Sequence, residues 1–285
     1  MIEIALMIFQ RVAASGMRRH AVQLVLLLSA ACSLAVPVRA TETVALYAAG
    51  SLRDALGEIA RTFQTATGTK IVTKFGPSGL LKDEIAAGAQ ADVFASANME
   101  HPQALHAAGK SGPVILFARN RLCALVKPGL KVDSGGLLER MLDPQIKLGT
   151  STPKADPSGD YAFEVFRKAD ALKPGARAEL EKKALQLTGN PSSAQPPQGR
   201  AVYGWHVAEG RADIFLAYCT ATAEAKKQNP DQQIVELPAS LSVGADYGLT
   251  VMSGAAQPAP ALARFIVSPA GQKILAGYGF APAQP

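Results

Sequence analysis

The chain has 285 residues, of which 48% are hydrophobic and 18% are charged, and its formal net charge is +6. This composition excludes a disordered chain, and the length is enough for two modest domains with cores of their own. The basic residues form no stripe and are not interleaved with aromatic residues, so the sequence does not support nucleic-acid binding.

The first 40 residues have the pattern of a secretory signal peptide. Arg18 and Arg19 precede the apolar run AVQLVLLLSAACSLAV, and Val-Arg-Ala at 38–40 forms the cleavage site. The apolar run is short for a membrane span. We expect residues 1–40 to be removed and the mature protein to be periplasmic, with a permanent anchor or lipid attachment at Cys32 as alternatives. Cleavage removes four arginines and one glutamate, which leaves a net charge of +3.

From residue 44 the chain alternates short β runs with helical patterns. The predicted strands are VALYAAG at 44–50, TKIVTKF at 69–75 and ADVFASA at 91–97. Apolar residues at helical spacing between 52 and 63 predict a helix after the first strand, and LLKDEIAAG at 80–88 predicts another. This β-α-β-α-β order predicts a doubly wound α/β layer with a parallel sheet.

The following elements carry the chain into a second unit. A helix at about 100–109 precedes the long extended runs PVILFARN and RLCALVKP, which we interpret as a crossing between two domains. Beyond this crossing we expect strands and helices around a polar Pro/Gly/Ser loop. The predicted strands are 145–151 and 212–218, the predicted helices are 160–170 and 200–210, and the loop is 189–199.

The end of the chain is predicted to return to the first domain, because its strand and helices have no new sheet to build. These elements are a strand at 245–254 and two helices broken at Ser268-Pro269. The two crossings, near 118–126 and near 235–243, then form a hinge. We predict two doubly wound α/β lobes joined by a two-strand hinge. Lobe I comprises 41–120 and 240–285, and lobe II comprises 121–239.

Two cysteines, Cys123 and Cys219, remain after the signal peptide is removed. In an oxidising compartment such a pair can form a disulfide. As buried free thiols the two residues would behave instead as small hydrophobic side chains. The sequence leaves both possibilities open.

Three turns share one pattern, in which a strand ends, a serine follows and a helix begins. They are Ala49-Gly50-Ser51, Gly76-Pro77-Ser78-Gly79 and Asp156-Pro157-Ser158-Gly159. A helix N-terminus has unpaired N–H groups and a partial positive charge, so it can hold an anion without lysine or arginine. Serine at a helix start is also an ordinary N-cap. These turns alone therefore indicate only a small anionic or polar ligand.

Longer stretches around these turns resemble a known family. VALYAAGSLRDALGEIARTF and FGPSGLLKDEIAAGAQADVFASAN are similar to the opening of periplasmic molybdate-binding proteins of ABC importers, and ALARFIVSPAGQKILAGYGF is similar to their closing helix. The resemblance implies the fold of a type II periplasmic binding protein, with molybdate or tungstate held between the lobes and an importer permease as partner. It implies no cofactor, no metal cation ligands and no enzymatic activity, and we expect a monomer.

The resemblance also implies which residues bind the oxyanion. Two serine hydroxyls of the family correspond to Ser51 and Ser78, a backbone N–H corresponds to that of Ser158, and a tyrosine hydroxyl corresponds to Tyr218. A further N–H at a helix start corresponds to Arg200, where the family has a neutral residue. Arg200 can donate its N–H, bring a charge to the anion or point to solvent.

Neutral donors suit a dianion that loses its hydration shell in a closed cleft, because charge-assisted hydrogen bonds replace that shell. A rigid ring of donors also selects anions by size, since molybdate and tungstate have longer bonds to oxygen than sulfate has. A site made only of donors disfavours an anion that carries a proton, such as protonated phosphate.

The sequence has no Gly-x-Ser-x-Gly elbow, no P-loop and no dinucleotide fingerprint, which argues against an enzyme. His101 and His106 are five residues apart, off the spacing of a helical metal pair, and His206 has no such partner. Tyr203 and Trp205 belong either to the lobe core or to the wall of an organic-ligand cleft. A binding protein for another oxyanion or a small organic anion, and a membrane-coupled sensor, are the alternatives.

Overall fold

Residues 43–283 are described in a computed structural model; the predicted signal peptide and Cys32 lie outside them. The first sheet is built around β1 (Thr43–Ala49), whose side chains alternate between a buried and a more accessible face. It pairs in parallel with β2 (Lys70–Gly76) on one side and with β3 (Val93–Ser96) on the other. The parallel sheet predicted for this half is confirmed.

Helices connect these strands as the apolar spacing predicts. After the short helix η1 (Gly50–Leu52), α2 (Arg53–Thr67) follows β1, α3 (Ser78–Ala86) follows β2 and α4 (Glu100–Ala107) follows β3. The first long helix ends at Gly68, whose φ of 74° is the left-handed conformation that glycine adopts without steric cost. The β-α-β-α-β order is therefore confirmed.

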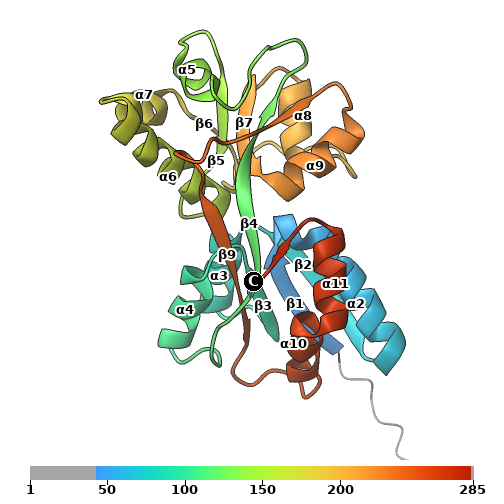
Figure 1. Cartoon of the computed structure of the whole chain (residues 1–285). Helices are drawn as coiled ribbons and strands as arrows, with labels where there is room; N and C mark the ends of the chain where they lie inside the picture. Colours follow the sequence, from blue (N-terminus) through green and yellow to red (C-terminus); the bar gives the residue numbers. More distant parts are fainter. Residues whose placement is uncertain (1–42, 284–285) are drawn as a thin grey trace, which may run out of the picture. The chain divides into compact units, whose positions relative to one another are not determined.

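The end of the chain returns to this first half. Strand β9 (Gly244–Val251) lies antiparallel to β3, and α10 (Ala259–Val267) and α11 (Pro269–Gly277) pack against α2 (Figure 1). Near the C-terminus, β10 (Ala281–Pro282) pairs with β4 (Ile115–Val126). Because β9 also pairs with β4, it occupies an internal position in the order β2-β1-β3-β9-β4.

The second half has its own sheet with helices around it. Strand β5 (Leu148–Ser151) pairs in parallel with β6 (Leu185–Thr188) and with β7 (Ile214–Tyr218), and β8 (Gln233–Glu236) pairs with β4. The helices are α5 (Leu137–Leu142), α6 (Pro157–Leu172), α7 (Ala176–Lys183), α8 (Val202–Ala208) and α9 (Cys219–Gln228).

A single strand of 12 residues, β4, runs through both halves. Its residues 115–121 pair with β9, and its residues 122–126 pair with β7 and β8. The two extended runs seen in the sequence are therefore one strand. The second crossing is the segment 237–243 between β8 and β9. Two lobes joined by a two-strand hinge are confirmed as the fold.

Cys123 and Cys219 form a disulfide, which settles the alternative that the sequence left open. Their Cα atoms are 4.9 Å apart although 96 positions separate them in the chain. Cys123 lies in the part of β4 that belongs to the second half, and Cys219 is the first residue of α9. The bond therefore ties the start of α9, next to Tyr218, to the strand that crosses between the halves.

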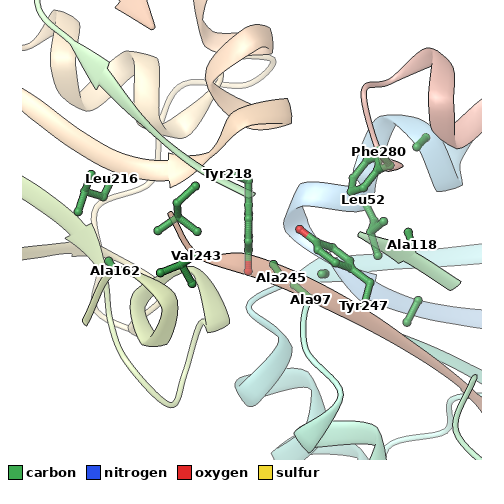
Figure 2. Close-up of a cluster of buried hydrophobic side chains, with 14 of the residues drawn as sticks. Leu52, Ala97, Ala118, Ala162, Leu216, Tyr218, Val243, Ala245, Tyr247 and Phe280 are labelled. Atoms are coloured by element: carbon green, nitrogen blue, oxygen red, sulfur yellow. The ribbon is translucent and has the colours of Figure 1, made fainter. Parts of the chain in front are cut away.

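One apolar core extends through both halves and includes the aromatic residues at the crossing. Tyr247 of β9 contacts Phe117 and Phe280 edge to face, and its ring centre lies 5.6 Å from that of Tyr218 (Figure 2). Such pairs stabilise a core beyond the area they bury. Within residues 43–283 no helix combines the length and apolarity that crossing a membrane requires.

Candidate functional site

Ser51 lies in η1, directly after β1. Its side chain is half-buried, and its Oγ lies 3.0 Å from the hydroxyl of Tyr247, so the two groups form a hydrogen bond in which either can donate. The same Tyr247 hydroxyl accepts from the side-chain amide of Asn120 at 3.4 Å. This chain of contacts holds Ser51 against β9, which carries Tyr247, and β4, which carries Asn120.

Ser78 is the first residue of α3 and is buried, with 1% of its surface exposed. Its Oγ accepts the backbone N–H of Ala97 at 3.1 Å. A hydroxyl group has one proton to donate in addition to its acceptor sites. Ser78 can therefore stabilise the turn after β3 and still donate a hydrogen bond to a ligand.

Ser158 lies in the first turn of α6 and is completely buried. Its backbone N–H, the group implied to bind the anion, donates to Oδ1 of Asp156 at 3.0 Å, because Asp156 is the N-cap of the helix. Its Oγ makes no hydrogen bond of good geometry with the described residues, although it lies close enough to the Tyr203 hydroxyl to lower the pKa of that phenol. The donor that remains available at this position is therefore the hydroxyl group.

Tyr218 is the last residue of β7 and is 1% exposed. Its hydroxyl has no hydrogen-bond partner among residues 43–283, and its ring packs edge to face against Tyr161. Burial raises the Tyr218 pKa well above the usual value, and the neighbouring Tyr247 hydroxyl and Asp156 carboxyl group add to this effect. The phenol therefore stays protonated and can donate a hydrogen bond.

Arg200 does not lie near the other predicted site residues. Its backbone N–H donates to the carbonyl of Pro197 at 3.1 Å, and its guanidinium donates to Oδ1 of Asn229 at 3.2 Å. Asn229 caps the C-terminal end of α9, whereas Tyr218 caps the N-terminal end, about 15 Å away along a helix of this length. The side chain of Arg200 is thus directed to the far end of that helix and is exposed.

A direct backbone contact joins the start of α3 to the residues just before α6. The N–H of Gly79 donates to the carbonyl of Ala155 at 2.9 Å. This bond brings Ser78, which precedes Gly79, close to the turn that carries Ser158. Together with the Ser51–Tyr247–Tyr218 contacts, it gathers four of the five predicted residues where the two lobes meet.

Asp156 and Tyr203 are two residues near this site whose roles the sequence does not predict. Asp156 is half-buried, and burial raises its pKa to about 6, partly offset by hydrogen bonds from Ser158 and Ser151. Tyr203 lies in the first turn of α8; burial raises its pKa, and the charge of Asp156 raises it further. The only signal for Asp156 is its N-cap position before Pro157, which is equally typical of a structural cap.

The described residues contain no group of three or more His, Cys, Asp or Glu side chains that could hold a metal ion. The side chain of His206 is buried, and burial lowers the pKa of His206 and of His101 to about 4. Both rings are therefore neutral at physiological pH. His106 bonds through Nδ1 to the carbonyl of Ser111 at 2.9 Å.

A groove of about 530 Å³ lies apart from the predicted residues. It runs along the face of α2 that carries Gly57, with Phe75 of β2 and Glu224 of α9 among its walls. Arg53 and Arg61 stand on either side of Gly57, and the guanidinium of Arg53 lies over the ring of Phe75 at 5.1 Å. None of the five predicted residues lines this groove.

The model of the bacterial extracellular solute-binding protein family matches residues 44–281, and the chain belongs to that family. A protein of Pasteurella multocida (strain Pm70) with no characterised function is 32% identical over 239 residues, which cover 84% of this chain and 98% of the relative. The molybdate-binding protein ModA of Azotobacter vinelandii is 30% identical over 138 residues, 47% of this chain and 54% of ModA.

The fold is shared with solved structures of solute-binding proteins. The sulfate-binding protein SubI from Mycobacterium tuberculosis H37Rv superimposes with a TM-score of 0.68 at 18% identity. The match covers 86% of this chain and 88% of SubI. The chain is therefore a solute-binding protein with two α/β lobes.

Proposed function

We propose that this protein captures molybdate or tungstate between its two lobes and delivers the oxyanion to an ABC importer from the periplasm. The observation that carries the proposal is a pair of buried hydroxyl groups, on Ser158 and Tyr218, that have no hydrogen-bond partner within residues 43–283. A buried polar group without a partner costs free energy, so these hydroxyls are suited to a ligand that accepts hydrogen bonds. The partial similarity to ModA supports the same ligand class.

The four convergent residues offer hydroxyl groups of neutral side chains. Ser51 and Ser78 would bind from the first lobe, and Ser158 and Tyr218 from the second. Hydrogen bonds to a charged acceptor are stronger than those between neutral groups, so four of them can replace much of an anion's hydration shell. Ser158 would donate through its hydroxyl, because its N–H is held by Asp156. Arg200 would act from outside the site.

Ligand capture would follow from closure of the lobes about β4 and the segment 237–243, with lobe I comprising 41–120 and 240–285 and lobe II comprising 121–239. Only the closed form lets one ligand contact both lobes, so the ligand shifts the population toward that form. A closed protein presents a surface that an importer permease can distinguish from the open one. We expect a monomer to perform this cycle.

A binding protein for another oxyanion or a small organic anion is the second candidate function. Asp156 favours it, because a carboxylate near the hydroxyls of Ser158 and Tyr218 gives the site a hydrogen-bond acceptor. A donor-only site has no such group. An anion that carries its own proton or hydroxyl group could use this acceptor.

A thermal melting screen against molybdate, tungstate, sulfate, phosphate and small organic acids tests both candidates, because a ligand stabilises the folded state according to its concentration and Kd. Calorimetry then gives the affinity of the best ligand. We expect Ser51→Ala and Ser78→Ala each to weaken molybdate binding by about 1.5–3 kcal/mol. Ser253→Ala, at an exposed position outside the hinge and the predicted site, is the control. Stabilisation by an organic acid but not by molybdate would select the second candidate.

A further inference from the structure

A carboxyl group lies among the hydroxyl groups of the second lobe. Oδ1 of Asp156 accepts the N–H of Ser158, and a Cβ atom at Gly189 would lie 3.4 Å from the other oxygen, Oδ2. The N-terminus of α6 therefore carries the hydroxyl of Ser158 beside the carboxyl group of Asp156, which also accepts a hydrogen bond from Ser151. The N–H of Ser158 is occupied by this cap.

Two independent features connect this carboxyl group with ligand binding. The hydroxyls of Ser158 and Tyr218 are at least nine-tenths buried and have no partner among the described residues. Ser151 and the N–H of Ser158 both hydrogen-bond to Asp156, and the hydroxyls of the same two serines lie within hydrogen-bonding reach of the Tyr203 hydroxyl. Asp156 is therefore part of the same cluster as the hydroxyls to which we assign the oxyanion.

No cation balances Asp156. Within residues 43–283 no lysine or arginine forms an ion pair with Asp156. Asp160 of α6 is the charged group that acts on Asp156, and the charge of Asp160 raises the Asp156 pKa. Tyr203 of α8 and Tyr218 of β7 are the other titratable groups facing it, and both stay neutral because their pKa values are raised. Ser151 of β5 contributes only a hydroxyl, and Lys154 is exposed.

We propose that Asp156 binds the oxyanion as a neutral carboxyl group, so that capture of each dianion takes up one proton from solvent. The inference rests on the proposed function. The proton passes from hydronium or the buffer acid to Oδ2, because Oδ1 already accepts from Ser158. One O–H bond forms on the carboxyl group, and the donor's bond to that proton breaks, which leaves water or the conjugate base of the buffer. An ionised carboxylate would repel the desolvated dianion. A protonated carboxyl group carries no charge and can donate a hydrogen bond to the dianion through its O–H.

This makes Asp156 a specificity-determining residue. Molybdate, tungstate and sulfate are fully ionised near neutral pH, so each would require Asp156 to be protonated. A ligand that brings its own acidic proton, such as hydrogen phosphate, would find an acceptor in the ionised carboxylate and take up no further proton. The number of protons taken up on binding therefore distinguishes the two ligand classes.

The test is calorimetric titration of the full-length mature protein with sodium molybdate at pH 7.5 in buffers of different ionisation enthalpy. The slope of the observed enthalpy against the buffer enthalpy gives the proton uptake. We expect about one proton for the wild type and about none for Asp156→Asn, since asparagine retains the N-cap. The wild-type association constant should fall about tenfold per pH unit above pH 7, whereas the variant should show little change. Asp160→Asn, the neighbouring carboxyl, should still take up about one proton.

Wild-type binding without proton uptake would overturn the inference and leave the proposed function intact. Proton uptake that persists in Asp156→Asn would overturn it as well, because another group would then carry the proton. Asp156→Ser, which also caps the helix, serves if the asparagine variant fails to fold. If neither molybdate nor tungstate binds the wild type between pH 6.5 and 8.5, the proposed function fails and this inference fails with it.

Discussion

The N–H of Gly79 in the first lobe donates to the carbonyl of Ala155 in the second lobe at 2.9 Å. The approach is so close that a Cβ atom at Gly79 would lie 2.1 Å from the carbonyl oxygen of Lys154. Both partners are backbone atoms, so no side-chain rotation can relieve the overlap. The absence of a side chain at Gly79 is thus a condition for this contact between the lobes.

Gly79→Ala should therefore oppose closure. We expect the variant to lose at least tenfold in ligand affinity while the melting temperature of the ligand-free protein changes by a few degrees at most. Calorimetry and thermal melting measure the two effects. Gly57→Ala is the matched control: its Cβ would lie 3.5 Å from the Arg61 side chain, and alanine should stabilise α2 by about 1 kcal/mol. Unchanged affinity in Gly79→Ala would contradict the role given to this contact.

Tyr218→Phe should have opposite effects on stability and on binding. The variant removes a buried hydroxyl that has no partner within the described residues, so the free energy of unfolding without ligand should stay the same or rise by about 1 kcal/mol. Ligand affinity should fall by about 1.5–3 kcal/mol, because a hydrogen bond to a charged acceptor is lost. Urea unfolding and calorimetry give the two values.

Tyr278→Phe is the control for that change. The hydroxyl of Tyr278 donates to Glu58 at 2.8 Å, remote from the predicted site, so its loss should weaken stability slightly and leave affinity unchanged. A Tyr218→Phe protein that binds as tightly as the wild type would remove Tyr218 from the site.

Removing the disulfide should lower stability substantially. Cys123 and Cys219 are 96 positions apart, so the bond restricts a large loop in the unfolded chain. We expect the double variant Cys123→Ser, Cys219→Ser to lose about 2–5 kcal/mol of unfolding free energy in urea. Thiol titration of the denatured wild type should find neither cysteine free. Equal unfolding free energies for the wild type and the double variant would contradict a stabilising role for the disulfide.

Asp156 should make the ligand-free protein less stable as pH rises. Its pKa in the folded protein is raised to about 6, above the value near 3.8 expected when unfolded, so the unfolded state loses its proton first. This loss of unfolding free energy is absent below pH 4, grows between pH 4 and pH 6 and reaches its full value above pH 6. We expect Asp156→Asn to be more stable than the wild type at pH 8, and this gain to shrink toward pH 4 in urea unfolding. A gain in unfolding free energy that does not change with pH would contradict the raised pKa of Asp156.

The sequence predicts the strand and helix order well, because apolar periodicity and glycine placement act locally. It places the start of the helix at 160, whereas α6 begins at Pro157, since the aspartate cap and the proline extend it by one turn. It divides β4 into two runs, because no local signal distinguishes a long strand from two short ones.

The site is harder to predict than the fold, because hydrogen-bond partners can be far apart in the sequence. The serine turns are visible in the sequence, but only the structure shows that the N–H of Ser158 is occupied by Asp156. The same holds for Arg200, whose partner Asn229 lies 29 positions away. Similarity to a family indicates which positions correspond along the chain. It does not indicate the hydrogen-bond partners that each residue has in this protein.

The internal position of β9 has a consequence for how the polypeptide acquires its fold. This strand lies between β3 and β4, yet the second lobe, which begins with the last residues of β4, is inserted in the chain before β9. A polypeptide emerging with its amino end first therefore cannot place β9 in its first sheet until residue 251 is available, and β10 pairs with β4 only later still. The second lobe can assemble earlier, from one contiguous stretch. We expect the first half of a nascent chain to stay incomplete, and sensitive to proteases, until nearly all of the protein has emerged.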